Sequence, residues 1–218
     1  MNEQAAAEHL QVIRTLMERS AVYRRALAPI MIFAGLVGTT AAGFGGVVQS
    51  ATGFVLMWFG VAAVTLIGAL LLTRQQALKD AEPFWSPPTR RVAQAMLPAL
   101  VAGLVIGICV LVVFAKPGPA DPPTGSTELD NLIWLPAAWA VLYGCALHAA
   151  GFFTPRGLRW LGWLNVLGGV AIFLGIAIAD QVECPAWWSH ALMGLYFGVP
   201  HLAYGVYLHL TKQGKNVA

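Results

Sequence analysis

The five histidines are the side chains of this sequence best suited to demanding chemistry. His190, His201 and His209 share one apolar run near the C-terminus, and His148 lies in an earlier run. At about 100° per residue, His190 and His201 fall within roughly 20° of each other on a helix. If both runs cross a membrane in one direction, His148 can meet His201 or His209, and two facing imidazoles can hold haem b. The alternative is a packing role, with a tyrosine, Asn165 or a backbone carbonyl as hydrogen-bond partner.

No other motif points to an enzyme. The sequence contains no CxxCH for covalent haem attachment, no HExxH and no GxSxG. Cys109, Cys145 and Cys184 form no CxxC, which argues against a disulfide framework, and the first two are expected as small buried hydrophobes. We therefore expect a non-enzymatic membrane subunit or interaction protein without a cofactor, which works through a cytoplasmic or membrane protein partner. A b-type cytochrome is the alternative.

A proline beside a histidine indicates a second kind of site. Pro200 removes one backbone hydrogen bond and frees the carbonyl of Tyr196, so a kink is expected beside His201. A broken helix can line a small cavity, which Asn165 and Tyr204 could share, although ordinary packing gives the same pattern. The second alternative is therefore a carrier for a neutral or apolar small solute. No apolar run contains Asp, Glu, Lys or Arg, which argues against an ion-coupled transporter.

Small residues recur at helical spacing in three of the apolar runs. Such faces let two helix backbones approach closely. We expect tight helix contacts there, either within one chain or between copies in a homo-oligomer. The residues are Gly35, Gly38, Thr39, Ala42, Gly43 and Gly46 in the first run, Ala171 and Gly175 in the fifth, and Gly194, Gly198 and Gly205 in the last.

These residues are positioned by helices that the composition places in a bilayer. The chain is 58% hydrophobic and 11% charged, whereas a soluble domain carries about 25% charged residues. Six runs reach the roughly 20 apolar residues that a spanning helix needs. We expect an all-α membrane protein with a six-helix bundle over 26–211, a cytoplasmic amphipathic helix over 1–25 and a tail over 212–218. The spans are expected at about 26–47, 52–73, 95–115, 132–153, 160–179 and 189–210.

The basic residues indicate how the six runs are threaded. Twelve of the 13 Lys and Arg residues fall in links on one side, and Lys116 lies on the other. The positive-inside rule then places both termini in the cytoplasm, with the chain in a bacterial inner membrane. The basic residues are spread over several links, which argues against a nucleic-acid partner. The twelve are Arg14, Arg19, Arg24, Arg25, Arg74, Lys79, Arg90, Arg91, Arg156, Arg159, Lys212 and Lys215.

Aromatic and basic residues at the ends of the runs predict contacts with lipid headgroups. Tryptophan rings prefer the headgroup level, and basic residues beside a span attract anionic lipid. The N-terminal stripe of Leu10, Ile13 and Met17 could lie in the headgroup plane or dock a soluble partner. The residues expected at the lipid interface are Arg24, Arg25, Trp85, Arg90, Arg91, Trp187 and Trp188.

The N-terminal stretch reads IRTLMERS from Ile13 to Ser20 and YRRALAP from Tyr23 to Pro29. This opening resembles the start of a group of uncharacterised bacterial six-span membrane proteins. The resemblance covers about the first thirty residues. It implies a bacterial inner membrane and attaches no activity to the chain.

Overall fold

The computed structural model describes residues 26–81, 83–114, 132–179, 185 and 187–216, and these ranges contain helices and no strand. Five of the helices are long and apolar enough to cross a membrane. They cover Ala26–Val47, Ala51–Lys79, Thr89–Phe114, Gly157–Ile178 and Trp187–Thr211. The expected N-terminal helix with Arg24 and Arg25, the link over 116–131 and Cys184 lie outside the described residues.

The first two helices are joined by a very short turn. The first helix covers residues 26–44 and ends in the 3-10 turn η1 (Gly45–Val47). Helix α2 (Ala51–Lys79) begins after Ser50, whose Oγ accepts a hydrogen bond from the Gly53 N–H at 3.1 Å. A serine at this N-cap satisfies one of the unpaired N–H groups of the new helix, so the chain can reverse within a few residues.

The remaining helices follow the expected order with shifted ends. Helix α3 (Pro87–Phe114) begins at a proline, which is well tolerated in a first helical turn because no N–H is needed there. It is followed by α4 (Trp134–Ala150), α5 (Gly157–Ile178), α6 (Trp187–Met193), the π-helical turn η3 (Gly194–Gly198) and α7 (Val199–Asn216).

Helix α4 is shorter than the span expected over 132–153. It has 17 residues, which give a length of about 25 Å at 1.5 Å per residue, against about 30 Å of hydrocarbon. At the end of the helix the N–H groups of Phe152 and Phe153 donate hydrogen bonds to the carbonyls of Ala149 and Ala150, three residues earlier. This spacing is tighter than that of an α-helix. The turn that follows carries the chain into α5.

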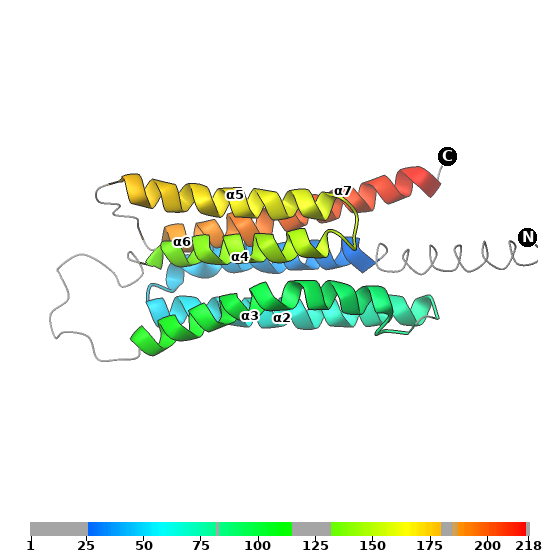
Figure 1. Ribbon diagram of the computed structural model, residues 1–218, viewed down its shortest axis with the longest axis horizontal. Coiled ribbons are helices and arrows are strands. Elements are labelled where there is room, and N and C mark those ends of the chain that lie inside the picture. Colours follow the sequence, from blue (N-terminus) through cyan, green and yellow to red (C-terminus); the bar gives the residue numbers. More distant parts are fainter. Residues whose placement is uncertain (1–25, 82, 115–131, 180–184, 186, 217–218) are drawn as a thin grey trace, which may run out of the picture.

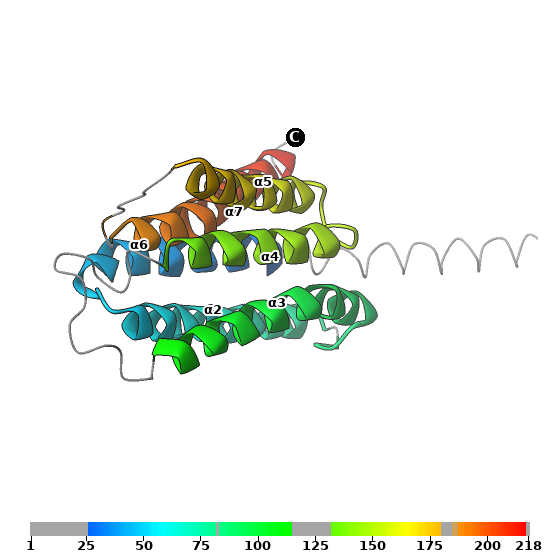
Figure 2. The same ribbon diagram turned by 60° about the vertical axis from the view of Figure 1, so that its left-hand side comes forward.

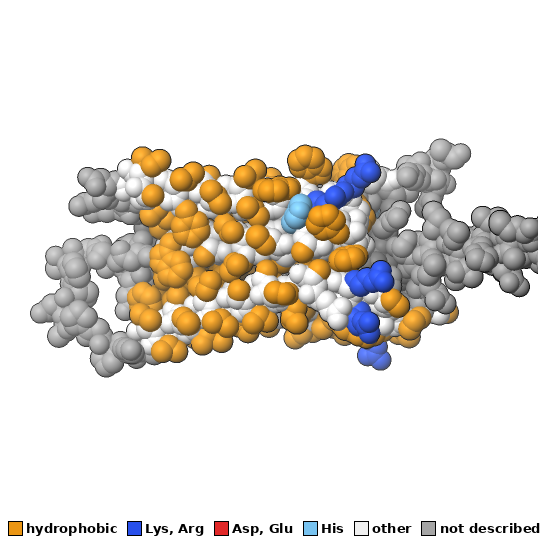
Figure 3. Space-filling view, viewed as in Figure 1, with side chains coloured by type: hydrophobic (Ala, Val, Ile, Leu, Met, Phe, Trp, Pro, Cys, Tyr) orange, Lys and Arg blue, Asp and Glu red, His pale blue; other side chains and the backbone are white. Residues whose placement is uncertain are grey.

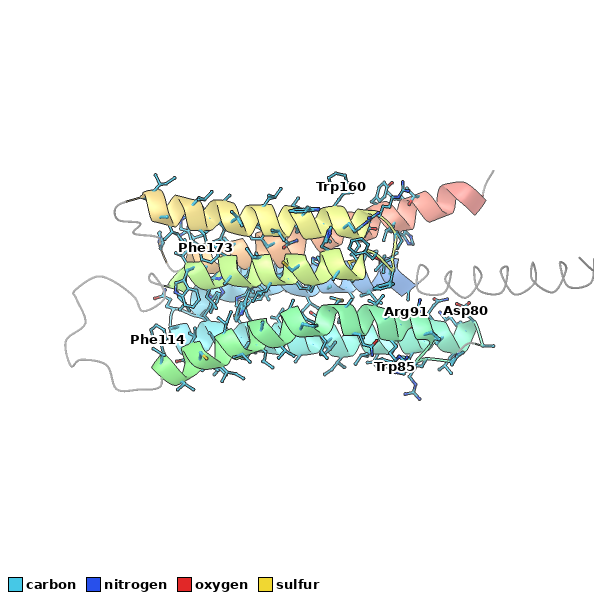
Figure 4. The ribbon with its side chains drawn as sticks, in the orientation of Figure 1. Asp80, Trp85, Arg91, Phe114, Trp160 and Phe173 are labelled. Carbon is cyan, nitrogen blue, oxygen red and sulfur yellow. The ribbon has the colours of Figure 1, made fainter. Side chains whose placement is uncertain are left out.

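The helices form two groups, which differ in how much of each helix is buried against its neighbours. Figures 1 and 2 both show α2 and α3 as a pair beside a group that contains the first helix, α4, α5 and the α6–η3–α7 run. The first helix begins, and α7 ends, at the same end of the bundle (Figure 1). Apolar side chains cover the length of the face in Figure 3, and its Lys and Arg side chains gather near that end. Figure 4 shows Asp80, Trp85 and Arg91 there and Phe114 at the opposite end.

Close backbone contacts confirm part of the small-residue prediction. A Cβ added at Gly198 would lie 2.8 Å from the Thr39 backbone nitrogen, so the first helix and η3 can meet only through a glycine. The same holds between α4 and α5, where a Cβ at Gly144 would lie 2.6 Å from the Gly162 carbonyl oxygen. These contacts are within one chain.

Other small residues do not serve as helix contacts within the chain. Gly43, Gly46 and Gly175 have nothing within 4 Å of an added Cβ, so the expected tight contacts are absent at these described positions. Cys109 and Cys145 are exposed, and the prediction that they are buried was wrong. An apolar environment outside the bundle suits a thiol as well as a protein core does, so residue type alone could not separate the two.

Candidate functional site

Three polar side chains from three helices form a layer in the middle of the bundle. Tyr143 of α4, Asn165 of α5 and His201 of α7 make up this central polar layer. Tyr143 and His201 are hydrogen-bonded to each other. Asn165 lies at the same level, because Gly144 packs against Gly162 and Val166 of α5.

Apolar clusters enclose the layer from both ends of the bundle. On one side the cluster is built on Ala140, Leu192 and Tyr196. On the other side it includes Leu147 and Leu161. Along α4 and α5 these residues lie about one helical turn from the layer. His201 and Asn165 are buried in this layer, so their hydrogen bonds are made inside the protein or with a ligand that reaches the layer.

His201 uses one of its two ring nitrogens. The side chain is 1% exposed, and its Nε2 lies 2.8 Å from the Tyr143 hydroxyl. Its Nδ1 is buried without a hydrogen-bond partner. If the tyrosine donates to Nε2, Nδ1 carries a proton that is not donated; in the other tautomer Nδ1 is an unused acceptor. In both cases one hydrogen-bonding position of the imidazole is unfilled.

Asn165 presents a second unfilled position. The side chain is fully buried, and its Nδ2 donates to the Leu161 carbonyl at 2.9 Å, which fixes the orientation of the amide. The Oδ1 then has no partner. Leaving a buried acceptor unpaired costs about 1–3 kcal/mol, and such groups are uncommon in native structures. Two of them in one layer call for a functional explanation.

The backbone beside the layer is irregular. Pro200 has no N–H, and the π-helical turn η3 lies directly before it in the chain, ending at Gly198. In this turn the Val199 N–H bonds to the Gly194 carbonyl, five residues earlier. Single π-helical turns inside α-helices occur frequently at functional sites. Tyr204 belongs to the neighbouring apolar cluster and packs over Gly157 of α5, so it borders the layer from one side.

His190, eleven residues before His201, makes a complete set of hydrogen bonds. Trp58 donates its Nε1–H to His190 Nδ1 at 3.2 Å, and His190 Nε2 lies 3.0 Å from the Val48 carbonyl. An indole can only donate and a carbonyl can only accept, so this imidazole is neutral with its proton on Nε2. The Phe54 ring packs edge-on against it at 4.9 Å. His190 thus joins α6, α2 and the turn between the first two helices.

Sequence reasoning did not find this contact. Trp58 and Val48 lie 132 and 142 residues from His190, and nothing in their local pattern marks them as its partners. Gly45 is the one residue whose type reflects this contact, because a Cβ added there would meet the His190 ring. A glycine at the end of an apolar run is too common to identify such a contact alone.

The histidines expected as haem ligands have different neighbours and different depths. His148 packs edge-on against Phe152 at 5.3 Å and Trp163 at 5.4 Å. It lies five residues, or about 7.5 Å, beyond Tyr143 along α4. His209 is exposed on α7. Within the described ranges no three His, Cys, Asp or Glu side chains are close enough to share a metal ion. His201 would have to release Tyr143 before its Nε2 could bind iron.

Residues expected at the lipid interface lie at the two ends of the bundle. Trp85, Arg90 and Arg91 are exposed, and Figure 4 shows Trp85 and Arg91 at the end where the first helix begins. Trp187 and Trp188 are exposed at the start of α6, with their rings stacked 4.9 Å apart. Exposure of this kind is what headgroup anchoring requires, and the contact with lipid itself stays a prediction.

The fold defines a multi-pass helical membrane protein. No family model, no curated protein and no solved structure matches the chain. The chemistry of the central polar layer is therefore inferred from its own groups. Tyr143, Asn165 and His201 supply hydrogen-bond donors and acceptors from three helices. These groups are suited to holding a neutral polar molecule by hydrogen bonds.

Proposed function

We propose that the chain is a six-span protein of a bacterial inner membrane with both termini in the cytoplasm. One observation and one general rule support this orientation. The described Lys and Arg side chains on the face of Figure 3 gather near one end, where the first helix begins and α7 ends. Cytoplasmic ends of spanning helices carry an excess of such residues.

The count of six depends on α4, the shortest of the apolar helices. If α4 did not cross, the basic link around Arg156 and the C-terminal lysines would both fall on the side opposite the basic link between α2 and α3. Leu132 and Ile133 extend the apolar segment before α4, and a 17-residue helix is at the lower limit for a span.

Labelling of a Gly125→Cys variant in intact cells, with the three native cysteines replaced, tests the topology. A membrane-impermeant thiol reagent should label position 125 without cell lysis. Labelling that requires lysis would reverse the proposed orientation.

For the activity, we propose that the central polar layer binds a small neutral solute. The single observation that carries this is the pair of buried, unpaired polar atoms, His201 Nδ1 and Asn165 Oδ1, in one layer beside a π-helical turn. A solute that bonds to both atoms recovers the hydrogen bonds that the folded chain lacks. The free energy recovered, about 1 kcal/mol or more per bond, is then part of the binding free energy.

The chemistry of the two atoms limits the class of solute. Asn165 Oδ1 is an acceptor and requires a donor from the solute. His201 Nδ1 is either a donor or an acceptor, depending on whether Tyr143 donates or accepts. An alcohol or a primary amide can donate and accept at once, so it satisfies both atoms in either tautomer. The uncharged walls disfavour an ion, because a buried charge needs a partner charge or several strong hydrogen bonds.

Swelling of proteoliposomes under osmotic gradients tests this activity. The probes are urea, acetamide, ethylene glycol and glycerol, with sucrose as an impermeant reference. At least one probe should enter faster than into protein-free liposomes, and the increase should be lost in the Asn165→Leu variant. The matched control is His209→Ala, an exposed position on α7, which should behave as the wild type. Identical rates with and without the protein for every probe would reject the proposal.

A further inference from the structure

The connection between α4 and α5 brings arginines and exposed aromatic rings to one corner of the bundle. We call it the α4–α5 corner, and it lies at the end where the first helix begins (Figure 1). Phe152 is 65% exposed and Trp160 is 75% exposed. Figure 4 shows Trp160 pointing away from the bundle. The corner consists of Phe152, Phe153, Arg156, Arg159 and Trp160.

The Arg159 side chain lies against the Phe152 ring. Its carbon atom Cζ lies 5.4 Å from the centre of the Phe152 ring. The aliphatic part of the side chain crosses Gly151, where an added Cβ would collide with Arg159 Cγ. His148 also packs edge-on against Phe152, with the two ring planes at 88°. The arrangement presents a cation above an aromatic plate, as in a cation–π contact.

Among the described residues no acid forms an ion pair with this cation. Asp80 is the one acidic residue in the described part of the chain, and it accepts a hydrogen bond from Gln76 at the end of α2. Within the described ranges neither Arg156 nor Arg159 forms an ion pair. Arg156 is exposed beside the same corner. Two arginines, with no acid at the corner among the described residues, favour an anionic ligand, and the guanidinium geometry suits a phosphate group.

We propose that the α4–α5 corner binds the phosphate headgroup of an anionic phospholipid, with Arg159 as the principal contact. Arg156 adds a second positive charge, and Phe152 and Trp160 contact the lipid at the level where aromatic rings favour the interface. The occupant is a lipid because the rings that flank the guanidinium are exposed at the edge of an apolar helix. A free phosphate ion would gain nothing from those rings.

Gly151 makes a test possible that separates this site from general attraction by positive charge. Gly151→Ala keeps every charge and displaces Arg159 from the ring. Arg159→Gln removes the charge at similar length. Arg74→Gln is the matched control, because it removes an exposed charge from α2 and lies outside the set expected at the lipid interface. Phe152→Leu removes the aromatic ring that contacts the Arg159 guanidinium and keeps an apolar side chain at the interface.

The full chain is purified with a mixture of phosphatidylglycerol and phosphatidylcholine, and the lipid retained is counted by native mass spectrometry. The wild type and Arg74→Gln should retain phosphatidylglycerol preferentially. Arg159→Gln and Gly151→Ala should reduce that preference about tenfold, the effect of one lost charge-assisted hydrogen bond. Phe152→Leu should reduce it less.

Three results would overturn the proposal. Arg159→Gln could retain the preference, or Arg74→Gln could lose it to the same degree, which would leave only general charge attraction. Millimolar inorganic phosphate could displace the retained phosphatidylglycerol, which would identify a free anion as the ligand. Melting temperatures of all variants in phosphatidylcholine alone establish that each is folded. If Gly151→Ala is unfolded there, Phe152→Leu and Arg159→Gln decide the outcome.

Discussion

His190 and His201 belong to one helical run, are equally buried at 1% exposure, and differ in how many of their hydrogen bonds are made. His190 has a partner on each ring nitrogen, from α2 and from the turn before it. His201 has one partner, Tyr143, and one buried nitrogen without any. Both ring nitrogens of His190 are hydrogen-bonded within the fold, and only one ring nitrogen of His201 is.

This difference separates a structural residue from a binding residue more reliably than burial does. A fully bonded polar group lowers the free energy of the folded chain and offers nothing to a ligand. A buried group with an unfilled position raises that free energy by about 1–3 kcal/mol until something bonds to it. The two regions should therefore respond in opposite ways when their polar atoms are replaced by carbon.

The largest expected effect is on stability, from His190→Leu. The change leaves the Trp58 N–H and the Val48 carbonyl unpaired and should lower the free energy of unfolding by about 2–3 kcal/mol. Denaturant unfolding in mild detergent, followed by tryptophan fluorescence, measures it. Solute entry should be unchanged at a temperature where the variant is folded. A loss below about 0.5 kcal/mol would show that this histidine is not the structural one of the pair.

Trp58→Phe should have the next largest effect, a loss of about 1–2 kcal/mol. The ring and most of its packing are kept, and His190 Nδ1 loses its only donor. A double-mutant cycle with His190→Leu isolates the bond. Additive losses would mean that the 3.2 Å contact contributes nothing.

Tyr143→Phe tests the comparison of the two histidines at His201. It removes the hydroxyl that bonds to His201 Nε2 and should cost about 1 kcal/mol or less, since hydrogen bonds between membrane helices average about 0.6 kcal/mol. Solute selectivity should change more than stability does, because the imidazole is then free to rotate. Melting temperature and swelling rates, measured on one preparation, give both readouts. A loss as large as that of His190→Leu would remove the distinction between the two histidines.

Asn165→Leu should have the smallest effect, and of opposite sign. Replacing a buried amide that has an unpaired oxygen by an apolar side chain of similar size should raise the free energy of unfolding by up to about 1 kcal/mol. Thermal unfolding in the absence of solute measures it. A clear destabilisation would indicate that the Asn165 amide is needed by the fold itself.

The sequence allowed the helices to be predicted more completely than the site. Apolar length is a local property, so the five helices long enough to cross overlap expected runs, whereas α4 is shorter than the run expected over 132–153. The observed helix ends differ from the expected span ends because helix formation does not stop where apolar character stops. Thus α2 continues to Lys79, past the expected end at 73, and α3 begins at Pro87 instead of at 95.

The candidate site could be predicted only in part. Asn165 and His201 stood out as polar residues in apolar runs, and a tyrosine was among the partners expected for the histidine. Which tyrosine bonds to His201, and which ring nitrogens stay unpaired, depends on how three helices rotate against each other. The contact of His190 with Trp58 depends on the same packing. Single-residue spacing carries no information on such rotations.

Two expectations stay predictions with tests of their own. A membrane subunit should purify with a partner after gentle solubilisation, and a chain that stays alone and transports a solute would contradict that hypothesis. A b-type cytochrome should show a Soret band after haem supplementation, and its absence would exclude His148, His201 and His209 as haem ligands.

Solute entry into proteoliposomes that contain either the wild type or Asn165→Leu tests most directly whether the central polar layer binds a ligand. We predict that at least one neutral alcohol or amide enters faster with the wild type, and that the variant abolishes this increase while melting at an equal or higher temperature. Equal entry rates for the two proteins with every probe would contradict the assignment of His201 and Asn165 to a binding site.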